Sequence, residues 1–243
     1  MIIAYKNAVY DYTITATTEL PNQPATNLQD NRLSRKWHSA IGGTNYLTLS
    51  DSFALDCVIV KDHNIALTDT VTLEGAADNT FASLTTEEEI EVIAGGFALF
   101  IDAATKYWRL KIESADSVYI GGLYMGVSTE LPDYELTYNV VYNTADVERL
   151  SDSGQLYGDK MYNYRVGAFI FPWVVREVDD VALIELWETH TTIRPFYVVQ
   201  FPDKISHYPV WYCKLEKTCC DFTGDNANAQ IYSNVGFNIR EVF

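Results

Sequence analysis

The sequence predicts an all-β protein made of two antiparallel β domains. The 243-residue chain is 48% hydrophobic and 14% aromatic, with 17 tyrosines, a composition that suits folded β structure and not disorder. Short runs rich in β-branched and aromatic residues recur along the whole chain, separated by turn-forming Asn, Asp and Gly residues. The length is sufficient for two domains that each bury a core.

The first part of the chain contains seven runs that read as strands. We expect them at 9–17, 46–50, 57–61, 70–74, 97–101, 107–113 and 118–127. The run at 107–113 is regular: Trp108, Leu110 and Ile112 fall on one face, and charged residues fall on the other. This alternation predicts a half-buried strand with Trp108 in the core. The acidic run at 87–89 is interpreted as a solvated loop or as a charged edge that blocks strand pairing.

The best boundary between the domains is the short polar segment STELPD at 128–133, which contains a proline. We therefore expect one domain over residues 1–130 and a second over 131–243. In the second domain the strands are expected at 134–142, 162–175, 196–201, 210–217 and 230–243. The segment 177–189 instead predicts a helix that packs on the sheet through one apolar stripe, formed by Val178, Val181, Ala182, Leu186 and Trp187.

The formal net charge of −16 limits the partners that the protein can bind. An acidic surface repels nucleic-acid phosphates and anionic lipid headgroups, so we expect neither specific nucleic-acid binding nor membrane binding. The N-terminal residues MIIAYK lack the basic start and apolar core of a signal peptide. Apolar stretches also stay well short of the length that spans a bilayer. These features predict a protein that is made in the cytoplasm.

No arrangement of residues predicts catalysis, a cofactor or a metal site. The four histidines lie far apart, at His38, His63, His190 and His207. The four cysteines match no zinc-binding spacing, and we interpret Cys57, Cys213, Cys219 and Cys220 as buried or free thiols, with a metal site or a disulfide as alternatives. Phosphate-binding loops, nucleophile elbows and dinucleotide fingerprints are absent from the sequence. We expect a protein that is not an enzyme.

An ordered set of motifs in the first domain resembles the discoidin-like, galactose-binding β-sandwich family. The motifs are ATNLQDN at 25–31, SRKWHS at 34–39, YLTL at 46–49, VIVKDHN at 58–64, KYWRL at 106–110 and IGGLYMG at 120–126. Each motif is short, but their order matches the family's order of strands and turns. The resemblance implies a jelly-roll sandwich of the kind found in lectins, receptor domains and appendages of glycan-active enzymes.

Polar residues within or beside these motifs are the candidates for a ligand-binding or interface loop. They are Asp30, Asn31, Arg35, His38, Asp62 and His63. Asn31 stands where the family often has glycine, and asparagine tolerates the positive φ that such a turn needs. This departure weakens the implication of a family-type calcium or sugar site around Asp30.

Two further patterns resemble proteins of tailed phages. The start MIIAYKN and the stretch NLQDNRLSRKW at 27–37 resemble minor tail or baseplate proteins. In the second domain, RLSDSGQ at 149–155, a long strand with Tyr164 and Arg165, a helix and RPF at 194–196 resemble the tail-tube or distal-tail fold. This second resemblance implies a β-sandwich or barrel with one helix that assembles into a ring of identical copies.

The expected function is a structural subunit of a phage tail tip or baseplate. Its partners would be its own copies in a ring and other tail or baseplate proteins, with host-surface glycan as a further candidate for the first domain. DNA would pass through the channel without specific binding, because an acidic lining repels it. The location would be the virion, assembled in the host cytoplasm.

Two other function classes remain open at this point. A stand-alone carbohydrate-binding module would use loops at one end of the first sandwich and bind a glycan as a monomer. An enzyme acting on a glycan would need a close pair of carboxylates among the 33 acidic residues. Mass in solution separates a ring-former from a binding module, and a turnover screen identifies an enzyme.

Overall fold

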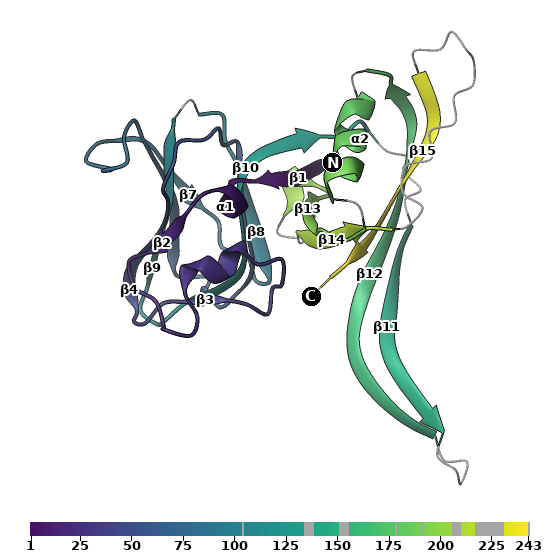
Figure 1. The fold of residues 1–243 in the computed structure, drawn as a ribbon, viewed down its shortest axis with the longest axis horizontal. Helices are drawn as coiled ribbons and strands as arrows, with labels where there is room; N and C mark the ends of the chain where they lie inside the picture. The colour runs from purple at the N-terminus through teal and green to yellow at the C-terminus, as the bar shows by residue number, and fades with distance from the viewer. Residues whose placement is uncertain are drawn as a thin grey trace. The chain divides into compact units, whose positions relative to one another are not determined.

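The computed structural model describes residues 1–103, 105–133, 139–150, 156–177, 179–190, 192–205, 210–216 and 231–242. The described chain is mostly β-strand, so the predicted all-β class is confirmed. It divides into two compact units, Met1–Glu130 with Tyr197–Trp211 and Leu131–Phe196 with Tyr212–Val242 (Figure 1). The segment Tyr197–Trp211, which we expected in the second domain, therefore belongs to the first unit.

The first unit is a sandwich of two antiparallel sheets. In one sheet the strand order is β13-β1-β10-β5-β8, with the short β3 paired to β10. Its strands are β1 Ile2–Asn7, β3 Trp37–His38, β5 Cys57–His63, β8 Gly96–Phe100, β10 Tyr119–Glu130 and β13 Phe196–Val199. The other sheet has the order β2-β4-β9-β6-β7. Its strands are β2 Ile14–Ala16, β4 Gly43–Leu49, β6 Thr70–Ala76, β7 Leu84–Ile90 and β9 Tyr107–Ser114.

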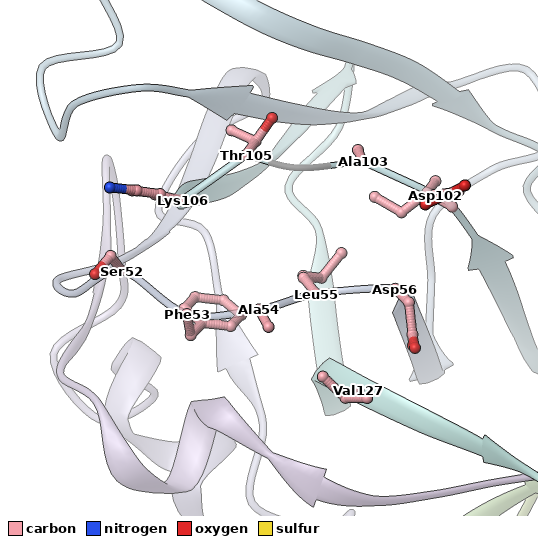
Figure 2. Close-up of a pocket in the computed structure, with 11 residues that line it drawn as sticks. Ser52, Phe53, Ala54, Leu55, Asp56, Asp102, Ala103, Thr105, Lys106 and Val127 are labelled. Atoms are coloured by element: carbon pink, nitrogen blue, oxygen red, sulfur yellow. The ribbon is translucent and has the colours of Figure 1, made fainter.

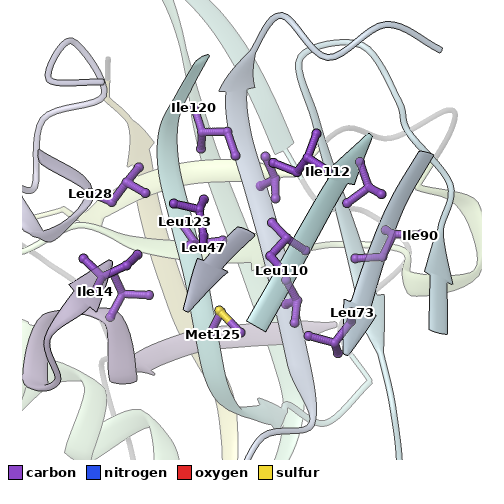
Figure 3. Packing of buried hydrophobic residues seen from close by; sticks show 14 of the residues in the cluster. Ile14, Leu28, Leu47, Leu73, Ile90, Leu110, Ile112, Ile120, Leu123 and Met125 are labelled. Carbon is purple, nitrogen blue, oxygen red and sulfur yellow. The ribbon is translucent and has the colours of Figure 1, made fainter. Parts of the chain in front are cut away.

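The core of the first unit lies between these two sheets (Figure 3). Trp108, Leu110 and Ile112 of β9 are fully buried, which confirms the predicted alternation. They belong to one hydrophobic cluster with apolar residues of β5 and β10 such as Val58 and Leu123. The core is contiguous and includes Trp37, so the first unit has the hydrophobic interior that a separate domain needs.

The acidic run 87–89 forms the middle of β7, an edge strand of the second sheet. All three glutamates are exposed. Of our two interpretations, the solvated loop is therefore wrong and the charged edge is correct. A row of carboxylates on an unpaired edge disfavours the addition of a further strand.

The N-terminal segment differs from the single strand expected at 9–17. The chain forms β1, then the short helix α1 Ala8–Asp11, and then β2. The side chain of Asn7 explains the break, because its Oδ1 accepts hydrogen bonds from the backbone N–H groups of Val9 and Met125. Its Nδ2 donates to the carbonyl of Leu123. Asn7 therefore caps α1 and ties it to β10.

Replacing Asn7 with alanine should lower the free energy of unfolding by about 2–3 kcal/mol, because buried backbone groups lose their partners. Urea unfolding of the purified variant measures this loss. Thr15→Ala is the control, because the Thr15 hydroxyl is exposed and bonds only the Thr48 carbonyl at 3.4 Å. Equal stability of the two variants would contradict the capping role.

The second unit contains a sheet with the strand order β11-β12-β15-β14. Its strands are β11 Asn139–Leu150, β12 Leu156–Val175, β14 Trp211–Leu215 and β15 Ile231–Glu241. The start of the strand expected at 134–142 lies outside the described residues, and β11 continues well beyond 142. Figure 1 draws β11 and β12 as a long curved hairpin. Phe169, Phe171, Phe196 and Phe237 pack together in the core of this unit.

The expected helix is present as α2 Asp179–His190, but its buried face differs from our prediction. Leu183 and Leu186 are fully buried, whereas Val181 and Trp187 are about half exposed. Val178 lies outside the described residues. The helix is apolar on both sides, so its sequence does not single out one stripe. The described helices include none that is both long and apolar enough to cross a membrane.

Two cysteines can be placed. Cys57 and Cys213 are both buried, as expected, and the Sγ of Cys213 donates to the carbonyl of Phe196 at 3.7 Å. Burial raises the pKa of the Cys57 thiol well above its usual value, so this group stays protonated and unreactive. Cys219, Cys220 and His207 lie outside the described residues.

Candidate functional site

One candidate site gathers polar residues where β3, β5 and β10 meet. The Nζ of Lys36 lies 2.9 Å from Oδ2 of Asp62 and 4.0 Å from the centre of the Tyr119 ring. The ring of His38 meets Tyr119 edge-on, and its Nδ1 lies 2.9 Å from Oε1 of Gln23. Two of the predicted site residues, His38 and Asp62, are thus brought together around Tyr119. We call this group the polar end.

The carboxylate of Asp30 is hydrogen-bonded and ion-paired to arginines of the same loop. Arg32 donates to its carboxylate from the backbone N–H and from the guanidinium, at 2.7–3.0 Å. Arg35 lies 3.6 Å away. The hydrogen bond from the Arg32 side chain is the main cause that lowers the pKa of Asp30. Asp30 and Arg35 therefore help to fix the loop, and the next residue, Asn31, is exposed.

The positive φ of this region lies at Asp62, with φ of 53°, and not at Asn31. Next to Asp62, the loop that contains Leu33 passes very close to Gly121 of β10. A Cβ atom on Gly121 would lie 2.5 Å from the carbonyl oxygen of Leu33 and 2.8 Å from Oδ2 of Asp62. Gly121 is thus required for the close approach of the loop to the sheet.

His63, the remaining predicted residue, has different partners from those of the polar end. Its Nε2 donates to the carbonyl of Ile93 at 3.0 Å, and its ring meets Phe97 edge-on. Desolvation is the main cause that lowers the pKa of His63, which favours the neutral ring. With Nε2 donating, Nδ1 can only accept, and it has no partner among the described residues.

A second candidate site is a hollow of about 640 Å³, which we call the loop pocket (Figure 2). Residues 52–56 between β4 and β5 line one side, and Val127 of β10 lines another. The remaining lining residues lie between β8 and β9: Ile101, Asp102, Ala103, Thr105 and Lys106. Asp56 precedes the seven-residue strand β5, whereas Asp62 lies near its end. The loop pocket and the polar end are therefore at opposite ends of the sandwich.

Backbone hydrogen bonds hold the two loops of the pocket together. The N–H of Phe53 donates to the carbonyl of Lys106 at 3.0 Å, and the N–H of Ile101 donates to the carbonyl of Asp56 at 2.8 Å. The Asp56 carboxylate also accepts from the N–H of Ser128 at 2.6 Å. Tyr12 stacks on the Phe53 ring with 5.7 Å between centroids. The pocket is thus formed before any ligand arrives.

The groups in both sites are hydrogen-bond donors, hydrogen-bond acceptors and apolar or aromatic side chains. Neither contains a nucleophile paired with a base, and we assign no catalytic group. Within the described ranges, no three His, Cys, Asp or Glu side chains lie close enough together to hold a metal ion. The loop pocket was missed in the sequence analysis. Its only signal was that two turns, at 51–56 and 102–106, precede strands that we expected to lie in one sandwich.

No protein-family model and no curated protein matches the chain. The solved structures that match part of the chain include a lectin domain of lectinolysin complexed with Lewis B antigen (TM-score 0.43, 9% identity, 50% of this chain and 96% of that one). A Streptococcus pneumoniae fucose binding module gives a TM-score of 0.41 at 12% identity over 49% and 94% of the two chains. The family 32 CBM from C. perfringens NanJ in complex with galactose gives 0.39 at 14% identity over 53% and 100%. Each of these three alignments covers about half of this chain and nearly all of the other one.

Proposed function

We propose that this chain is a structural subunit that assembles with other protein chains through its second unit. The sequence resemblance makes the tail tip of a tailed phage the proposed assembly, with the second unit in a ring. In this proposal the first unit is an accessory sandwich attached to the ring. The acidic character of the chain, with a net charge of −16, suits a channel through which DNA passes without binding.

The distribution of exposed apolar side chains is the observation that carries this proposal. Among the described residues, nine of the twelve exposed large hydrophobic side chains lie in the second unit. They include Tyr142 at 75% exposure, Trp173 at 66% and Ile193 at 74%. Single exposed hydrophobic residues are ordinary, but a concentration in one unit is typical of a surface that binds protein.

The secondary structure of the second unit supports the same proposal. α2 presents Val181, Ile184 and Trp187 outside while it buries Leu183 and Leu186 inside. Strand β11 is the edge of its sheet, and its partner β12 carries the exposed Trp173. An edge strand with apolar neighbours can pair with another chain, unlike the glutamate-rich edge of the first unit.

Light scattering on the full chain tests the assembly. We expect a mass in solution that is a multiple of 27.5 kDa. The triple variant Tyr142→Ser, Trp173→Ser, Trp187→Ser should shift the protein to the monomer, because it removes the exposed aromatic side chains. The double variant Ile41→Ser, Leu67→Ser in the first unit is the matched control and should keep the wild-type mass. A wild type that remains monomeric at high concentration would contradict self-assembly.

A second candidate function is sugar binding by the first unit alone. The observation that favours it is the loop pocket, a preformed hollow with apolar and hydrogen-bonding groups in a sandwich that has its own core. The discoidin-like motifs in the sequence point to the same class of ligand. A monomer that binds a glycan would support this candidate over the structural subunit.

A further inference from the structure

We infer that the loop pocket, and not the polar end, is the sugar site of this protein, and that it takes a neutral saccharide. This inference rests on the second candidate function, because it names the location and ligand class of that activity. It departs from the sequence analysis, which placed the ligand-binding residues around Asp30, His38 and His63.

The lining of the loop pocket matches the two kinds of surface on a sugar ring. Phe53, Leu55, Ile101 and Val127 provide apolar contacts for the C–H groups of a pyranose. Ser52 carries a hydroxyl, and Asp102 and Lys106 are exposed and charged, whereas the Thr105 hydroxyl is bonded to the hydroxyls of Thr85 and Thr86. A volume of about 640 Å³ suits a ligand of one or two rings.

The charges of the pocket select among saccharides. Two carboxylates, Asp56 and Asp102, and one ammonium, Lys106, leave the lining with a net negative charge. Carboxylate oxygens accept hydrogen bonds from sugar hydroxyls, and one oxygen of Asp56 is already held by Ser128. The same carboxylates repel a phosphorylated or sulfated sugar, so a neutral ligand is favoured.

The polar end is less suited to a ligand because its groups already bind one another. Asp62 is paired with Lys36, and Asp30 is paired with Arg32. The ammonium of Lys36 also covers a face of the Tyr119 ring at 4.0 Å. A sugar that stacked on this face of Tyr119 would have to displace a cation–π contact and an ion pair. In the described lining of the loop pocket no ion pair or cation–π contact has to be broken, although the Thr105 hydroxyl is bonded to Thr85 and Thr86 and one oxygen of Asp56 to Ser128.

Saturation-transfer NMR on the full chain tests the inference, with galactose, fucose, glucose and N-acetylglucosamine as neutral probes and glucose 6-phosphate as the anionic probe. We expect at least one neutral sugar to bind with a Kd on the order of 1 mM, a value suited to an open pocket. Glucose 6-phosphate should bind more weakly than glucose. The variant Asp102→Asn should raise the Kd about tenfold, because it removes a charged acceptor.

Three further variants locate the site. Phe53→Leu keeps an apolar side chain in the lining of the pocket but removes the aromatic ring. This variant should also weaken sugar binding. Asp116→Asn, an exposed carboxylate between β9 and β10, and Lys36→Ala at the polar end should leave the Kd unchanged. If no probe binds, the sugar-binding function fails together with this inference. If a sugar binds and only Lys36→Ala changes the Kd, the function stands and the loop pocket is the wrong site.

Discussion

Replacing Trp108 with alanine is expected to lower the free energy of unfolding of the first unit by about 3–5 kcal/mol. Trp108 is fully buried in β9, between the two sheets of the sandwich. A Cβ atom on Gly75 would lie 2.7 Å from its ring, which shows how closely the neighbouring strand packs against it. Truncation leaves a large cavity that this rigid sheet cannot close. Urea unfolding followed by circular dichroism measures the loss.

Two controls separate packing from other effects. Leu67→Ala in the same unit removes a side chain that is 71% exposed, and it should change stability by less than about 0.5 kcal/mol. Trp108→Phe should cost much less than the alanine variant, since Nε1 of Trp108 has no hydrogen-bond partner among the described residues. If Trp108→Ala keeps full stability but loses sugar binding, Trp108 faces a ligand instead.

Period-two alternation made β9 predictable from the sequence. Trp108, Leu110 and Ile112 alternate with charged residues, and a one-residue shift would place those charges in the core. The N-terminal region was not predictable in this way. Whether residues 8–13 continue a strand or form a helical turn depends on Asn7, whose partners Leu123 and Met125 are more than a hundred residues away.

The domain boundaries show a similar limit to what can be predicted from the sequence. The boundary segment at 128–133 is a local signal of composition. Tyr197–Trp211 belongs to the first unit because β13 pairs with β1, which lies far earlier in the sequence. Hydrophobic pattern identifies such a strand but not its partner. The phage-tail resemblance of the second domain stays a prediction.

For the candidate sites, the sequence identified residue types but not their partners. The carboxylates of Asp30 and Asp62 were candidate ligand groups because they are polar and lie in loops. In the structure each is paired with a cation: Asp30 with Arg32 of the same loop, and Asp62 of β5 with Lys36, which precedes β3. The loop pocket arises only when two turns about fifty residues apart in sequence meet at one end of the sandwich.

The variant Leu186→Asp is expected to unfold the second unit. Leu186 is fully buried on the inner side of α2, which contacts β12. A carboxylate placed there loses its hydration without a designed partner, at a cost of several kcal/mol, and the packing of the leucine is also lost. This sum approaches the whole stability of a typical domain. Limited proteolysis and near-ultraviolet circular dichroism should show loss of the second unit's structure.

The matched variant Val181→Asp tests which face of the helix is inside. Val181 belonged to the stripe that the sequence predicted to be buried, yet it is 52% exposed in the structure. It lies in the first turn of α2, where a carboxylate interacts favourably with the helix dipole, so this variant should fold with stability close to wild type. If Val181→Asp unfolds the unit as Leu186→Asp does, the whole predicted stripe faces the sheet and the orientation of α2 is wrong.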